Sequence, residues 1–153
     1  MNPISEKIEK YLNEMQFRVT SKKEIVNLDP KNKSILNHPD VAKMKNREGY
    51  TPLHIAAKYH PEVSKHPEAS KVVDKSGATP LHHAAEWYHE VLTHPDVAKV
   101  KDNNGNTPLH IAAFHHPEAS KHPDFAKVKN NNGMTPKDHA DQMKAIHHNR
   151  NND

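Results

Sequence analysis

Histidine is the residue type that offers this chain the most chemistry. The sequence holds 15 histidines among 153 residues and has no cysteine. A neutral imidazole is the commonest metal ligand in proteins. Histidines stand side by side in three places: His82-His83, His115-His116 and His147-His148. A histidine-based metal-binding protein is therefore one hypothesis for the function.

The spacing of the histidines argues against one shared metal ion. Two series recur every 28 residues: His54, His82 and His110, and His38, His66, His94 and His122. Equivalent residues of stacked helical repeats lie about 10 Å apart, whereas zinc ligands lie about 2 Å from the ion. We therefore expect no metal site and no cofactor. Four histidines outside both series keep the metal alternative open: His60, His89, His115 and His116.

A second motif repeats at the same interval as the histidines. It predicts the structural elements that carry them. Gly-x-Thr-Pro-Leu-His starts at Gly49, Gly77 and Gly105, and a weaker copy starts at Gly133. Thr can cap a helix whose first residue is Pro, and Gly permits the tight turn before it. Leu then faces inward, and the Ala pair that follows lets neighbouring helices approach. Two motifs with one period predict a stacked repeat protein.

Composition favours the same architecture. Only 33% of the residues are hydrophobic, and the mean hydropathy is -1.01. This apolar content is low for a single central core, but it is sufficient for the small interfaces between stacked repeats. The absence of cysteine is typical of a reducing compartment. The N-terminus has no apolar run typical of a signal peptide, and no segment is long and apolar enough to span a membrane. We expect a soluble, cytoplasmic protein, or one in host cytoplasm if it is an effector or viral protein.

The repeated pattern D/N-x-x-G-x-T-P-L-H-x-A-A closely resembles the ankyrin repeat over about residues 45–140. The resemblance implies an all-α, ankyrin-like solenoid of short helix-turn-helix repeats with projecting loops and helical caps. It also implies that His54, His82 and His110 bridge the loops of adjacent units by hydrogen bonds. The interval of 28 residues is shorter than the usual 33 or so. The missing residues fall in the second helix, where Pro67 should stop it after little more than one turn.

The repeat divides the chain into seven predicted segments. They are an N-terminal capping helix at 1–20, a degenerate first repeat at 21–44, repeats at 45–72, 73–100 and 101–128, a C-terminal capping repeat at 129–147 and a flexible tail at 148–153. The histidine of each His-Pro step is predicted to stabilise a turn or a helix cap.

No catalytic motif is apparent, and we expect a non-enzymatic module. The resemblance implies protein binding through the loop tips and the exposed face of the first helices. The residues at these positions are Arg47, Glu48, Tyr50, Lys58, Tyr59, Lys75, Ser76, Glu86, Trp87, Asn103, Asn104, Asn106, Phe114 and His115. Four of the chain's few aromatic residues lie among them, and Trp and Tyr often dominate binding energy. The expected partner is a protein, which the chain would bind as a monomeric adaptor or inhibitor.

Two alternatives remain besides the metal-binding one. Lysines recur in two rows that could bind a polyanion or nucleic acid: Lys43, Lys71, Lys99 and Lys127, and Lys45, Lys101 and Lys129. Only three arginines are present, and they are not clustered, so we do not expect nucleic acid. The second alternative concerns Trp87 and Tyr59, which could fold down over the shortened second helix instead of facing a partner.

Overall fold

The computed structural model describes residues 36–37, 41–43 and 45–152. The predicted capping helix at 1–20 and most of the degenerate repeat at 21–44 lie outside these residues. The described part is helical and contains no β-strand. Its α-helices are α3 (Pro52–Ala56), α4 (Pro80–Trp87), α5 (Pro108–His115) and α6 (Pro136–Asn152), and its 3-10 helices are η2 (Pro61–Lys65), η3 (His89–Thr93) and η4 (Pro117–Lys121).

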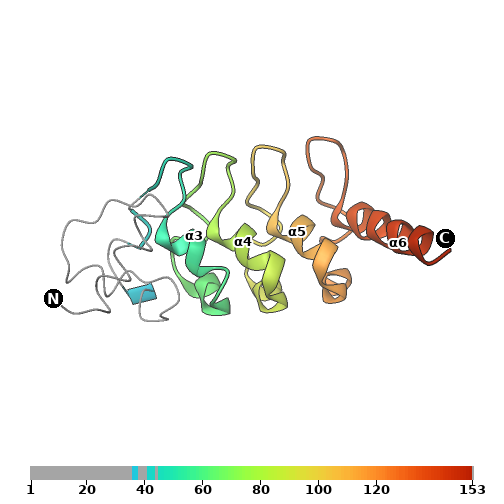
Figure 1. Ribbon diagram of the computed structural model, residues 1–153, viewed down its shortest axis with the longest axis horizontal. Helices are drawn as coiled ribbons and strands as arrows, with labels where there is room; N and C mark the ends of the chain where they lie inside the picture. Colours follow the sequence, from blue (N-terminus) through green and yellow to red (C-terminus); the bar gives the residue numbers. More distant parts are fainter. Residues whose placement is uncertain (1–35, 38–40, 44, 153) are drawn as a thin grey trace.

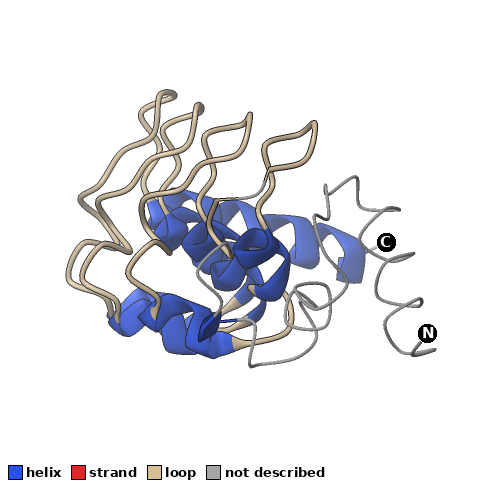
Figure 2. Ribbon diagram, turned by 90° about the vertical axis from the view of Figure 1, so that its left-hand side faces the viewer, coloured by secondary structure: helices blue, strands red, loops and turns tan. Residues whose placement is uncertain are grey.

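The repeats stack in the order of the chain. Each α-helix contacts the next, from α3 to α6, and the 3-10 helices form a second row. The loops that precede the α-helices all project to the same side (Figure 1). Seen along the stack, the loops, the α-helices and the 3-10 helices form successive layers (Figure 2). The all-α fold predicted from the sequence is confirmed.

Each first helix starts at the Thr-Pro step, as predicted. In the second described repeat, the Thr79 hydroxyl accepts the backbone N–H of His82 at 3.3 Å, and the Nδ1 of His82 accepts the backbone N–H of Thr79 at 3.1 Å. This reciprocal capping box recurs at Thr51 and Thr107. Histidine thus takes the place of the Glu or Gln usual in such a box.

The second helices are short because of the His-Pro step. Helix η2 is a 3-10 helix of five residues that ends before His66, and the backbone N–H of Glu68 donates to Nδ1 of His66 at 3.0 Å. The same bond forms at His94 and His122. The predicted short second helix and the predicted turn-stabilising role are therefore both observed where the structure describes these histidines.

One continuous apolar cluster runs through the stack. Leu53, Leu81 and Leu109 are each 0% exposed, and the Ala pairs that follow them are also buried. Val63, Val91 and Ala119 supply the matching contact from the 3-10 helices. Each repeat contributes a few inward-facing side chains, and thin repeats can therefore share one core.

The C-terminal helix α6 is longer than the first helices of the other repeats. It continues to Asn152, although the sequence predicted a flexible tail from residue 148. No Pro or Gly occurs after Pro136, so nothing in the local sequence stops the helix. In place of the motif histidine, Asp138 closes the cap by accepting the Thr135 N–H at 2.8 Å.

Hydrogen bonds form within each projecting loop and also between successive loops. In each, an Asn or Asp side chain organises the turn; Asp74 Oδ1 accepts the N–H groups of Ser76 and Ala78. Successive loops are then joined by backbone bonds, such as Asn103 N–H to the Ser76 carbonyl at 2.9 Å. The loops therefore form a connected edge of the stack.

Candidate functional site

Five of the predicted partner-binding residues line a single pocket. This cavity of about 370 Å³ lies between the first two described repeats and is lined by Tyr50, Lys58, Tyr59, Glu86 and Trp87, together with two histidines and two other residues. Tyr50 immediately precedes the cap of α3, Lys58 and Tyr59 follow the end of that helix, and Glu86 and Trp87 close α4. Stacking thus gathers side chains from two repeats into one hollow, which we call the aromatic pocket.

Trp87 is an exposed large hydrophobic side chain in this pocket. It is 50% exposed, although a tryptophan is normally well covered in a monomer. The Nζ of Lys58 lies 5.6 Å from the centroid of the Trp87 ring, which is within the range of a cation–π contact. Of the two orientations considered from the sequence, the structure has Trp87 facing solvent. Tyr59 is half-buried.

The backbone beneath the pocket is anchored between repeats. The Tyr88 hydroxyl donates a hydrogen bond to the carbonyl of Lys58 at 3.0 Å, and this bond links the end of α4 to the end of α3. Because the bond crosses the repeat boundary, it joins the two walls of the aromatic pocket. A preformed hollow of this kind loses little conformational freedom when it is filled.

The other predicted site residues lie apart from the aromatic pocket. Phe114 and His115 line a second cavity beside α6, where the Phe114 ring stacks on His139 with centroids 4.5 Å apart. The exposed tip residues are Arg47, Glu48, Lys75, Ser76, Asn103 and Asn104. The predicted set is therefore not one contiguous site.

Several loop-tip side chains have structural partners. Asn103 Nδ2 donates to the Lys75 carbonyl at 2.9 Å, and the Ser76 hydroxyl donates to Asp74. The Asn106 side-chain oxygen accepts a bond from Asn130. These three side chains join or shape the loops, and their variation among repeats does not by itself indicate recognition.

Two lysines of the predicted basic rows form hydrogen bonds to the next repeat. The Nζ of Lys45 donates to the Val73 carbonyl at 3.3 Å, and the Nζ of Lys101 donates to the Lys129 carbonyl at 3.1 Å. Each ammonium group thus caps a carbonyl of the next repeat. This arrangement favours a structural role for them over a row directed at phosphates.

The motif histidines bridge adjacent repeats as the resemblance implied. Nδ1 of His54 accepts the Thr51 N–H at 3.1 Å, so Nε2 carries the proton and donates to the Ala78 carbonyl of the next loop at 2.9 Å. His82 and His110 make the equivalent bonds to Asn106 and Met134. Burial lowers the pKa of His54 to about 4, although the bond to Ala78 opposes this shift.

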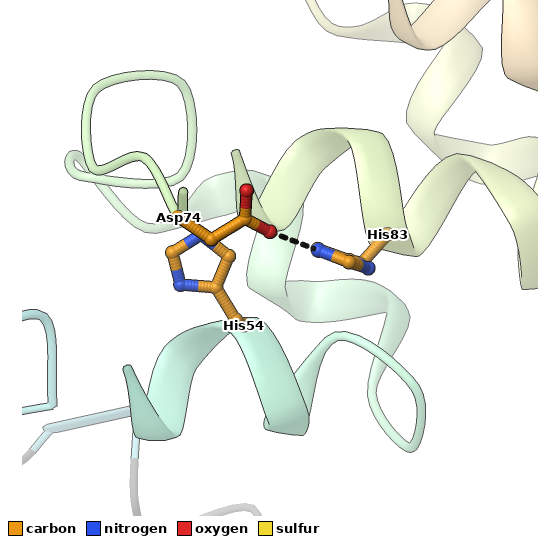
Figure 3. Close-up of side chains that lie close together, drawn as sticks. All are labelled: His54, Asp74 and His83. Atoms are coloured by element: carbon orange, nitrogen blue, oxygen red, sulfur yellow. Dashed lines mark hydrogen bonds and ion pairs between the residues drawn. The ribbon is translucent and has the colours of Figure 1, made fainter. Parts of the chain in front are cut away.

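A cluster that sequence reasoning missed lies in the wall of the aromatic pocket. Asp74 Oδ2 and His83 Nε2 are 3.1 Å apart, and the rings of His54 and His83 meet edge to face with centroids 5.5 Å apart. Figure 3 shows the three side chains converging from α3, from the loop and from α4. The available signal was His83 itself, which stands where Ile55 and Ile111 stand in the neighbouring repeats.

Asp74 is held in its charged form despite its burial. Its side chain is 2% exposed. Burial alone would raise the pKa of this carboxyl, but hydrogen bonds from Ser76, His83 and Ala78 outweigh it and hold the pKa below 3.8. The cluster therefore places a buried carboxylate beside two imidazoles.

The comparisons agree with this architecture. The family model described as Ankyrin repeat matches residues 104–128, which contain the cap Thr107, helix α5 and the 3-10 helix η4. No curated protein matches the chain. No helix within the described residues is long and apolar enough to cross a bilayer. The cap, the inward Leu and the bridging His of the matched segment recur at 51–54 and 79–82, so the two described repeats before it resemble the ankyrin repeat matched at 104–128 and precede it at a 28-residue interval.

Proposed function

We propose that the chain is a non-enzymatic protein-binding module, an adaptor or inhibitor, whose main contact is the aromatic pocket. Ankyrin repeats typically act in protein–protein interaction, and the matched repeat at 104–128 supports that class. The observation that carries the proposal is the half-exposed Trp87 in a hollow that it shares with Tyr50 and Tyr59. Trp and Tyr are the residues that most often supply binding energy when a partner buries them.

The mechanism is the insertion of a partner side chain between the two repeats. Trp87 and Tyr50 offer large apolar surfaces, and Lys58 and Glu86 offer one charge of each sign at the mouth. Because the bond from Tyr88 to Lys58 joins the walls, the partner meets a hollow that already exists. The exposed loop tips Arg47, Glu48, Lys75 and Asn104 would form the polar rim of the same interface.

We expect the substitution Trp87→Ala to weaken partner binding by about 30-fold or more, which corresponds to about 2 kcal/mol for a central aromatic residue. The natural chain is first used as bait in a lysate of its source organism, and the captured protein is identified and purified. Its dissociation constant is then measured by calorimetry for the natural chain, Trp87→Ala and Tyr50→Ala. Because Trp87 is half-exposed, the variant should retain its thermal stability.

The matched control for this measurement is His89→Ala. His89 is exposed, lies on η3 in the layer of 3-10 helices and does not line the aromatic pocket. We expect this variant to bind the purified partner with unchanged affinity. Affinities within twofold of the natural chain for both Trp87→Ala and Tyr50→Ala would refute the aromatic pocket as the main contact.

A further inference from the structure

Three potential metal ligands converge in the wall of the aromatic pocket. His54, Asp74 and His83 each offer one ligand atom, and these atoms lie within 4.8 Å of one another. The residues come from α3, from a loop and from α4, so the cluster exists only because two repeats stack (Figure 3). Within the part of the chain that the structure describes, no other group of three histidines or acids converges in this way.

We propose that His54, Asp74 and His83 form a zinc-binding site whose fourth coordination position opens toward the aromatic pocket. Two imidazoles and one carboxylate are a common protein ligand set for zinc with an open position. Ligand atoms around a tetrahedral zinc ion are about 3.4 Å apart. The pair formed by Asp74 Oδ2 and His83 Nε2, at 3.1 Å, is already close to that spacing.

Asp74 and His83 are the primary ligands. Asp74 Oδ1 is occupied by bonds from Ser76 and Ala78, which leaves Oδ2 directed at His83. Zinc would take the place of the imidazole proton between these two atoms, and that proton would move to Nδ1 of the same ring. The His83 side chain is 30% exposed, which gives an ion access from the aromatic pocket.

His54 is the third and weakest ligand, because both of its ring nitrogens are engaged. Its Nε2 donates to the Ala78 carbonyl at 2.9 Å, and coordination through that atom would replace this bond. The proton would move to Nδ1, from which it can be donated to the Thr51 hydroxyl at 2.8 Å, and the Thr51 N–H would lose Nδ1 as its acceptor. The site therefore exchanges one link between repeats for another that passes through the metal ion.

The neighbouring repeats contain incomplete versions of the same set. The next repeat has His82 and Asp102 but carries Ile111 in place of the second imidazole. The last copy has His110 and His139, with rings 5.2 Å apart, but Asn130 replaces the carboxylate and its Nδ2 lies 3.3 Å from Nε2 of His139. These differences supply substitutions that the fold already accommodates.

The test is calorimetric titration of the full chain with zinc chloride, after removal of metal with a chelator. We expect one equivalent to bind to the natural chain, and at least a tenfold loss of affinity for that equivalent in both Asp74→Asn and His83→Ile. These variants install the residues found at Asn130 and Ile111, so both should keep the natural circular dichroism spectrum. If His83→Ile did not fold, Asp74→Asn would decide alone.

A gain of binding completes the experiment. Asn130→Asp should complete the set formed with His110 and His139, and the number of zinc ions bound at high affinity should rise from one to two. The other histidines of the chain are unchanged in every variant and control for adventitious binding. The proposal is overturned if the natural chain binds no zinc, or if Asp74→Asn and His83→Ile bind it as the natural chain does. Neither result depends on the proposed protein partner.

Discussion

Acidification from pH 7.5 to pH 5 is expected to lower the free energy of unfolding, and His54 alone contributes about 2 kcal/mol to this loss. His54 is 2% exposed, and its equivalents His82 and His110 are 3% and 0% exposed. Burial lowers the pKa of all three, to about 4 for His54. Protonation of His54 at Nδ1 would remove the acceptor of the Thr51 N–H in the helix cap and would bury a charge, while the bond that Nε2 donates to Ala78 would remain.

The direction of this effect follows from the pKa difference between the folded and unfolded states. An unfolded histidine has a pKa of about 6.5, so the unfolded chain binds more protons than the folded chain below that pH. The stability contributed by neutral His54 is complete above pH 6.5 and declines as the pH falls from 6.5 toward 4. Asp74, whose pKa lies below 3.8, stays charged at pH 5 and does not contribute to the loss.

Urea unfolding at pH 7.5, 6.5 and 5, with a chelator present, measures this loss. The matched variant is His54→Gln, whose amide stays neutral throughout the range. We expect Gln to destabilise the protein at pH 7.5 but to reduce the difference between pH 7.5 and pH 5 by about 2 kcal/mol. Equal stabilities of the natural chain at pH 7.5 and pH 5 would contradict the prediction.

The elements of this fold were predictable because their signals are local. The Thr-Pro step specifies where α4 starts through the cap at Thr79, and the proline after His66 limits η2 to five residues. Each signal acts within a few residues of the chain and is repeated at the same interval. The extension of α6 to Asn152 was missed because only the absence of a stop signal indicates it.

The candidate sites were only partly predictable because they form across repeat boundaries. Comparison of equivalent positions identified Trp87 and Tyr50 as variable, but the pocket that gathers them depends on how α4 lies against α3. The cluster of His54, Asp74 and His83 joins three different positions of the repeat. A comparison of each position only with its equivalents in the other repeats therefore cannot detect this cluster. The separation of Phe114 from Trp87 likewise follows from packing against α6.

The substitution Gly77→Ala should destabilise the protein by about 3 kcal/mol. Gly77 has a φ of +78°, and a Cβ there would meet the Asn103 backbone nitrogen at 2.8 Å and its side-chain oxygen at 2.5 Å. Alanine would therefore strain the turn and also push apart two loops that are joined by the bond from Asn103 to Ser76. Urea unfolding of the two proteins at pH 7.5 measures the difference.

Gly133→Ala separates the two causes of this loss. Gly133 has nearly the same φ, +75°, but a Cβ there would have nothing within 4 Å. It should therefore show only the cost of the left-handed backbone, about 1 kcal/mol. Adding Asn103→Ala to Gly77→Ala should recover little stability, because the backbone nitrogen of residue 103 would still clash with the Cβ added at residue 77. Equal losses for Gly77→Ala and Gly133→Ala would mean that the loops do not bear on one another, and that the α-helices alone hold the repeats in register.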